Sequence, residues 1–233
     1  MSIKAVIFDL DGTLLNSLDD IADALNYALK SAERSPLALD RVRRFVGNGV
    51  PKLIERALDF TGGGGADAQR CFDECLERFK EYYDVHNADK TKPYVGAADM
   101  LRSLKALGVK TAINTNKYDG AARALKDRFF GDADAVVGAS PDVRPKPSPD
   151  GALKALRMLG VSAADAIYVG DGETDIATAR NSGLMAVAVT WGFRDRAELE
   201  ALKPDFMIDA PNELVPTLAA AGLIDIKAVR RDA

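Results

Sequence analysis

Acidic residues gather in two short segments of this 233-residue chain. Asp9 and Asp11 stand two residues apart in Asp-Leu-Asp-Gly-Thr, and Asp171 and Asp175 belong to Gly-Asp-Gly-Glu-Thr-Asp. Alternate residues of an extended chain share a face, so one of the first two carboxylates can attack while the other handles a proton. That segment alone is also compatible with a calcium loop or a simple turn. The second segment adds oxygen ligands of the kind Mg²⁺ prefers, although its carboxylates could merely cap a helix.

Residues that could hold an anion lie between the two acidic segments. Thr115 and Asn116 offer a hydroxyl and an amide that can donate hydrogen bonds to phosphate oxygens. Lys146 stands between Pro145 and Pro147, which restrict the backbone and so direct the ammonium. A rigidly held cation suits the negative charge of a phosphoryl-transfer transition state. Each residue could be ordinary loop chemistry by itself, but together they predict a phosphoryl-transfer site.

Apolar runs would position these residues. Short, β-branched segments that read as strands buried on both faces occur at 4–8, 109–113, 135–137, 166–169 and 186–189. Helical patterns alternate with them at 97–107, 121–129, 149–159 and 175–182. This alternation predicts an α/β fold with a doubly wound parallel sheet, which binds ligands beyond the carboxyl ends of its strands.

Residues 17–92 break the alternation. Helical spacing of apolar residues predicts helices at 18–29, 40–46, 52–60 and 67–83, with Ser17 as the N-cap of the first. The glycine run at 62–65 lacks a following Lys-Ser/Thr and reads as a joint, not as a phosphate loop. We therefore expect a helical cap domain over 17–92, inserted into an α/β core formed by 1–16 and 93–233.

Composition limits the partners and the compartment. The net charge is -4 with acids and bases mixed, and no segment is apolar enough to span a bilayer. We expect a cytoplasmic protein with a small-molecule substrate and with no nucleic-acid or membrane partner; no pattern indicates an oligomeric state. Cys71 and Cys75 read as reduced thiols, and His86 as a surface or loop residue.

In these motifs the chain resembles the haloacid dehalogenase superfamily, and within it the phosphoglycolate phosphatase group. The matching motifs are Asp-Leu-Asp-Gly-Thr at 9–13, Thr115-Asn116, Lys146, and Gly-Asp at 170–171 with Asp175. The resemblance covers nearly the whole chain, and 17–92 lies where the family carries a helical cap. Segments 45–50 and 55–58 resemble the phosphoglycolate phosphatase cap in particular. The chain departs from the pattern at Asn16, where an acid is common, and at Gly172, where serine is common.

The resemblance implies a role for each motif residue. Asp9 would attack phosphorus and become an aspartyl phosphate, while Asp11 would protonate the leaving alcohol and then activate water. A carboxylate of Asp9, the backbone carbonyl of Asp11 and the carboxylate of Asp171 would hold Mg²⁺, and Asp175 would orient metal-bound water. The phosphoryl oxygens would be bound by Thr115, Asn116 and Lys146.

The resemblance also makes 2-phosphoglycolate the expected substrate. Asn48 and Gly49 lie at a turn between two expected cap helices that could reach the site, and Arg56 could steer an anion or simply be a solvated helix charge. A sugar phosphomutase shares all four motifs and is the main alternative, followed by a pyrophosphatase or nucleotidase. Asp11 argues against a dehalogenase, which lacks the second aspartate. The intact motifs argue against a non-enzymatic binding module.

Overall fold

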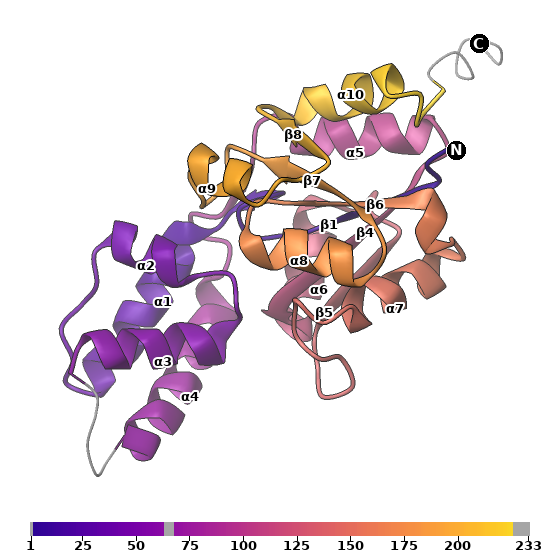
Figure 1. Ribbon diagram of the computed structural model, residues 1–233. Coiled ribbons are helices and arrows are strands. Elements are labelled where there is room, and N and C mark those ends of the chain that lie inside the picture. The colour runs from indigo at the N-terminus through magenta and orange to yellow at the C-terminus, as the bar shows by residue number, and fades with distance from the viewer. Residues whose placement is uncertain (1, 63–67, 226–233) are drawn as a thin grey trace.

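A six-stranded sheet forms the centre of the larger part of the molecule (Figure 1). The computed structural model describes residues 2–62 and 68–225. Every neighbouring pair in the sheet is parallel, and the order is β5-β4-β1-β6-β7-β8. The strands are β1 (Ala5–Phe8), β4 (Lys110–Tyr118), β5 (Ala135–Ala139), β6 (Ala166–Gly170), β7 (Met185–Val189) and β8 (Phe206–Ile208). This arrangement confirms the predicted doubly wound α/β fold.

Helices cover both faces of the sheet because alternate strand residues point to opposite sides. Val6 and Phe8 of β1 pack with α5 (Ala97–Ala106), α6 (Asp119–Phe129) and α10 (Leu214–Ala220). Ala5 and Ile7 pack on the other face, with α7 (Asp150–Leu159), α8 (Glu173–Asn181) and α9 (Arg196–Ala201). Short 3₁₀ turns cover Ala163–Asp165 and Pro211–Glu213. The sheet is thus buried on both sides, as the continuous apolar runs predicted.

Strand β4 is longer than its apolar run indicated. We expected a strand at 109–113 with Thr115 and Asn116 beyond its end, but both residues lie within Lys110–Tyr118. The pairing with β1 stops at Phe8–Ile113, whereas an irregular pairing with β5 continues as far as Tyr118–Ala139. Thr115 and Asn116 therefore lie beyond the end of β1, although not beyond the end of their own strand.

Four helices form a separate bundle, drawn at the lower left of Figure 1. They are α1 (Leu18–Ser31), α2 (Leu39–Phe45), α3 (Val50–Phe60) and α4 (Ala68–His86). The bundle encloses its own apolar cluster, which includes Leu25, Ile54 and Phe79. The two connections to the sheet pair as a short antiparallel ribbon, β2 (Leu15–Asn16) with β3 (Lys92–Pro93). This ribbon lies at the predicted domain boundary, and the division into 1–16 with 93–233 and 17–92 stays a prediction.

Local details of the bundle differ from the sequence prediction. Ser17 makes no side-chain cap for α1; its hydroxyl donates to the Asp11 carboxylate instead, since a charged acceptor makes the stronger bond. Helix α3 begins at Val50, two residues earlier than expected, because Pro51 fits the first turn of a helix. Cys71 and Cys75 are free thiols, and His86 ends α4 on the surface, paired with Asp89. Residues 63–67, which contain most of the glycine run, lie outside the described residues.

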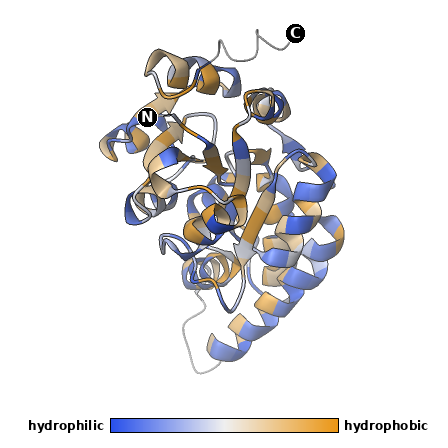
Figure 2. Ribbon diagram, turned by 90° about the vertical axis from the view of Figure 1, so that its right-hand side faces the viewer, coloured by the Kyte–Doolittle hydropathy of each residue, from blue (hydrophilic) through white to orange (hydrophobic). Residues whose placement is uncertain are grey.

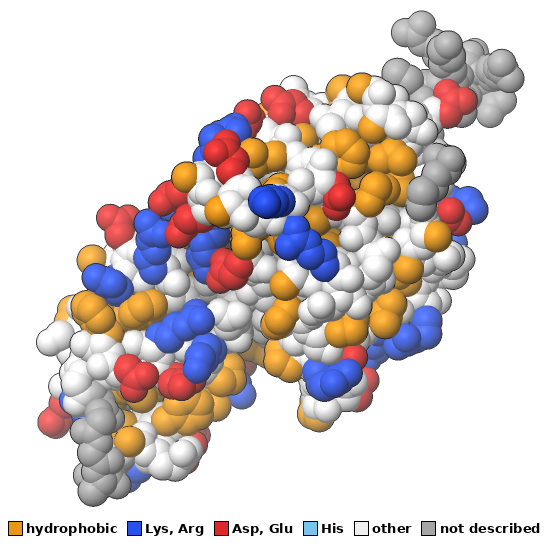
Figure 3. All heavy atoms as spheres, viewed as in Figure 1, with side chains coloured by type: hydrophobic (Ala, Val, Ile, Leu, Met, Phe, Trp, Pro, Cys, Tyr) orange, Lys and Arg blue, Asp and Glu red, His pale blue; other side chains and the backbone are white. Residues whose placement is uncertain are grey.

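The surface shows mixed charge. In Figure 2 the helices carry both hydrophilic and hydrophobic stretches, as expected for helices with one buried side. Acidic and basic side chains are interspersed over the face seen in Figure 3, without an extended area of one sign. Within the described residues, no helix combines the length and the apolar character needed to cross a membrane.

Candidate active site

The sheet brings the two acidic segments to one edge. Asp9 directly follows β1 and Asp171 directly follows β6, and these strands are neighbours with Phe8 paired to Val169. The backbone N–H of Asp9 donates to the carbonyl of Val169 at 2.9 Å. On either side of β1 the chain continues in opposite directions across the sheet, which makes this edge the switch point where doubly wound folds bind ligands.

Lys146 lies between two carboxylates at this edge. Its ammonium is 2.7 Å from Asp9 Oδ1 and 2.7 Å from Asp175 Oδ1, and its side chain is only 3% exposed. Asp175 also accepts a hydrogen bond from the backbone N–H of Gly172, so it caps α8 and faces the site at once. The structure thus brings together Asp9, Lys146 and Asp175, which are far apart in the sequence.

Asp171 is enclosed by backbone. Its Oδ2 accepts from the N–H of Phe193 at 2.7 Å, and its Oδ1 accepts from the hydroxyl of Thr13 at 3.3 Å. A Cβ atom at Gly12 or at Gly192 would lie 2.3 Å from an atom of the Asp171 side chain, too close for any other residue. Gly12 also has φ +90°, a conformation that favours glycine. These contacts hold the carboxylate in one orientation.

Burial and the neighbouring carboxylates raise the pKa of two carboxyl groups at this edge. Burial raises the pKa of Asp9 well above its usual range; the charge of Lys146 opposes this shift, and those of Asp175 and Asp171 add to it. Burial raises the pKa of Asp171 to about 7, with a further contribution from Asp175. A divalent cation at this point would offset the mutual repulsion of the carboxylates.

The donor set fits Mg²⁺. Oxygens of Asp9, Asp171 and Asp175 lie within 4.8 Å of one another, and hard cations take such carboxylate ligands. We had expected Asp175 to act only behind metal-bound water, but its carboxylate is part of this cluster. The side chain of Asp11 lies outside the cluster, which is compatible with the predicted use of its backbone carbonyl.

The carboxylate of Asp11 points toward a second lysine. Lys117 Nζ lies 3.2 Å from Asp11 Oδ2, and the hydroxyl of Ser17 donates to Asp11 Oδ1 at 2.5 Å. Lys117 also donates to the hydroxyl of Tyr83 at 2.5 Å, and its ammonium lies 4.4 Å from the centre of the Tyr83 ring. Asp9 and Asp11 therefore interact with different lysines, Asp9 with Lys146 and Asp11 with Lys117.

Thr115 and Asn116 occupy different positions with respect to a phosphate. Thr115 lines the cavity above Asp9, and its hydroxyl accepts from the N–H of Lys117. The amide of Asn116 accepts from the N–H of Lys146 at 2.7 Å and donates to the carbonyls of Lys146 and Gly47. These bonds hold the Lys146 loop against the helical bundle, while phosphate binding by either residue stays a prediction.

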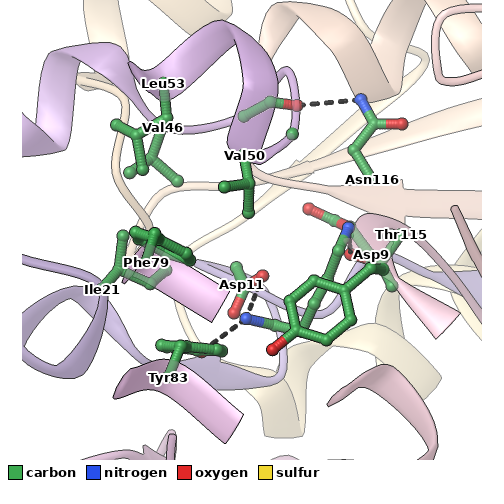
Figure 4. A pocket seen from close by; sticks show the side chains of 14 residues that line it. Asp9, Asp11, Ile21, Val46, Val50, Leu53, Phe79, Tyr83, Thr115 and Asn116 are labelled. Atoms are coloured by element: carbon green, nitrogen blue, oxygen red, sulfur yellow. Dashed lines mark hydrogen bonds and ion pairs between the residues drawn. The ribbon is translucent and has the colours of Figure 1, made fainter. Parts of the chain in front are cut away.

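The bundle closes over a small cavity above Asp9 and Asp11 (Figure 4). Its volume is about 50 Å³, and a water molecule needs roughly 10–15 Å³ measured in this way. The bundle contributes an apolar wall made of Ile21, Val46, Val50, Leu53 and Phe79. The sheet contributes Asp9, Asp11, Thr115, Asn116 and Lys117. The cavity is thus lined by apolar bundle residues on one side and by polar and charged residues on the other.

Of the three predicted bundle residues, Gly49 alone lines this cavity. A Cβ atom on Gly49 would lie 3.2 Å from the carbonyl of Asn116, so the loop approaches the sheet as expected. Asn48 donates to the hydroxyl of Thr174 at 3.1 Å and accepts from Arg56 at 2.7 Å. Arg56 also donates to the carbonyl of Phe45. Asn48 and Arg56 therefore link the loop to α8 and α2, and their contact with substrate stays a prediction.

Sequence reasoning missed Lys117, Tyr83 and the role of Ser17. Lys117 follows Thr115-Asn116 directly, so its position next to a predicted motif could have identified it as a candidate site residue. Tyr83 carried no signal, because only the packing of α4 against α1 brings it to the site.

Comparisons with known proteins agree with this geometry. Residues 3–183 match the family described as "Hydrolase: haloacid dehalogenase-like hydrolase". The phosphoglycolate phosphatase of Rhodospirillum rubrum is 40% identical over 195 residues, which cover 82% of this chain and 80% of that protein. The phosphoglycolate phosphatase of Aquifex aeolicus is 32% identical over 215 residues, covering 91% and 95%.

A solved structure agrees over the same range. The crystal structure of a protein from Lactobacillus delbrueckii subsp. bulgaricus superimposes with a TM-score of 0.88 at 33% identity, covering 94% of this chain and 99% of that one. The family match spans both acidic segments, Thr115, Asn116 and Lys146, and so confirms the resemblance that the motifs indicated. The chain belongs to the haloacid dehalogenase-like hydrolases.

Proposed function

We propose that the protein is a Mg²⁺-dependent phosphatase that hydrolyses a small phosphate monoester through an aspartyl phosphate on Asp9. One observation carries the proposal: Asp9 and Asp11 face the same small cavity, with Asp9 on the side of Lys146 and the metal-type cluster. A candidate nucleophile and a candidate proton donor thus line one cavity.

In the first step an oxygen of Asp9 attacks phosphorus as the bond to the leaving oxygen breaks. Asp11 gives its proton to that oxygen, and the alcohol leaves toward the bundle side of the cavity. Lys146 stands beside Asp9 and stabilises the added negative charge on the phosphoryl oxygens.

In the second step a water molecule attacks phosphorus and the bond to Asp9 breaks. Asp11, now ionised, accepts the proton of that water and is ready for the next cycle. When bound by Asp9, Asp171 and the Asp11 carbonyl, Mg²⁺ would neutralise phosphoryl charge. Asp175 keeps Lys146 in place through its 2.7 Å ion pair.

The proposed substrate is 2-phosphoglycolate. Curated relatives at 32–40% identity over most of both chains are named phosphoglycolate phosphatases. We further propose that the helical bundle is a cap domain that excludes bulk water, and that the protein works in the cytoplasm.

Purified protein should release phosphate from 2-phosphoglycolate with Mg²⁺ and lose this activity in EDTA. Asp9→Asn should keep the fold and lose turnover by roughly 10³-fold or more, in line with the removal of other nucleophiles. Mass spectrometry of the quenched reaction should find the phosphoryl group on Asp9. Full activity in EDTA, or phosphate on another residue, would contradict the proposal. Isomerisation of a sugar phosphate without phosphate release would instead favour a mutase.

A further inference from the structure

The bundle side of the cavity contains one positive charge in an apolar setting. Lys117 is 4% exposed, and the lining residues around it include Val46, Val50, Leu53 and Phe79. Among the residues that line the cavity, the only other charged side chains are those of Asp9 and Asp11. A buried ammonium is costly unless an anion accompanies it, and the carboxylate of Asp11, 3.2 Å away, is such a partner.

The lysine lies on the leaving-group side of the reaction centre. It is paired with Asp11, the proposed proton donor to the leaving oxygen, whereas Lys146 is paired with the nucleophile Asp9. The ammonium has three N–H donors, and Asp11 and the Tyr83 hydroxyl engage two of them. An anionic group on the substrate could accept from the third.

Tyr83 adds a hydrogen-bond donor at the same place. Its hydroxyl accepts from Lys117, which leaves its own hydrogen available to donate. Burial raises the pKa of Tyr83 well above its usual range, with a contribution from the charges of Asp11 and Asp20, so the hydroxyl keeps this hydrogen at neutral pH. An ammonium and a phenol side by side can donate to the two oxygens of one carboxylate.

We infer that Lys117 and Tyr83 form a carboxylate-binding subsite for the leaving group, which makes the preferred substrates small phosphate esters of 2-hydroxy acids. This inference rests on the proposed phosphatase function and assigns recognition to different residues from Asn48 and Arg56, whose polar groups bind Thr174 and Phe45. The subsite reads the carboxylate, while Lys146 and Thr115 face the phosphoryl group that all substrates share.

Two substrates that differ only at the carboxylate test the inference. 2-Phosphoglycolate carries a carboxylate where 2-hydroxyethyl phosphate carries a neutral hydroxymethyl group. The parent protein should prefer the first. Lys117→Met removes the partner of Asp11 for every substrate, so it should lower kcat/KM for both, but by roughly 10- to 100-fold more for 2-phosphoglycolate than for the neutral substrate, as expected for a lost charged hydrogen bond. Lys105→Met, which changes an exposed lysine paired with Asp132, is the matched control and should alter neither value.

Tyr83→Phe keeps the ring and removes only the hydroxyl, so it tests the subsite even if Lys117→Met does not fold. It should lower kcat/KM for 2-phosphoglycolate by roughly 3- to 10-fold, through KM, and leave the neutral substrate unchanged. Equal losses on both substrates would overturn the inference, because the two residues would then act through Asp11. A parent protein that hydrolyses 2-hydroxyethyl phosphate better than 2-phosphoglycolate would overturn it while the phosphatase function stands. A parent that hydrolyses no phosphate ester would end both proposals.

Discussion

Lys146→Met should destabilise the protein because it removes a buried positive charge. The loss of stability should be larger at neutral than at acidic pH. The ammonium lies 2.7 Å from both Asp9 and Asp175, and all three side chains are largely buried. Methionine keeps a similar length and an apolar stem but removes the cation. In the absence of metal the carboxylates then have no positive partner, and one of them has to take up a proton or remain buried and charged.

The free energy needed to protonate one carboxyl group sets the upper limit of the destabilisation that Lys146→Met can cause. A carboxyl group of ordinary pKa 3.8 is protonated at pH 7 at a cost of about 4 kcal/mol, and at pH 5 at a cost of about 2 kcal/mol. The pKa of Asp9 is already raised in the folded parent, and removal of Lys146, whose charge opposes that rise, raises it further, so the folded variant binds more protons than the folded parent. Stability is therefore retained below about pH 4 and falls as the pH rises. We expect the loss in unfolding free energy to grow from about 2 kcal/mol at pH 5 to about 4 kcal/mol at pH 7.

Urea unfolding followed by circular dichroism, in EDTA at the two pH values, measures this loss for the parent and the variant. Lys105→Met, which changes an exposed lysine paired with Asp132, is the control and should show no pH-dependent loss relative to the parent. A loss for Lys146→Met that is equal at pH 5 and pH 7 would refute the reasoning, because it would show that the side chain stabilises the fold by packing and not by charge.

Three further changes test other parts of the site. Asp11→Asn should slow alkyl phosphates more than aryl phosphates, whose leaving groups need little protonation; equal losses across a leaving-group series would exclude the assigned role. Asn48→Ala should raise KM by several-fold, about 1 kcal/mol, for 2-phosphoglycolate and p-nitrophenyl phosphate alike, because Asn48 binds Thr174; a rise for phosphoglycolate alone would show that it contacts the carboxylate. Arg194→Met removes donors to the carbonyls of Arg43 and Val46, so KM should rise roughly 3- to 10-fold and trypsin should cut the bundle faster. An unchanged rate of proteolysis would show that the hydrogen bonds of Arg194 do not hold the bundle in place.

Much of the fold was predictable because its signals are local. The continuous apolar runs at β1, β6 and β7 reflect burial on both faces of the sheet, and this burial follows from the parallel arrangement. Strand β8, three residues long with two half-buried, and the short helix α9 carry too little periodicity to be recognised. The extension of β4 to Tyr118 depends on an irregular pairing with β5, which no single segment encodes.

The sequence by itself indicated which residues are candidates for the chemistry. Asp9, Asp11, Lys146 and Asp171 are found by residue type and by their position along the chain relative to the apolar runs, since such runs mark strands by local pattern. Tertiary structure decided which group each of them faces. The pairings of Asp9 with Lys146 and of Asp11 with Lys117 depend on the order of the strands in the sheet, and the place of Tyr83 in the cavity depends on the packing of α4. Such contacts join residues far apart in the chain, and only the folded arrangement brings them within hydrogen-bond distance.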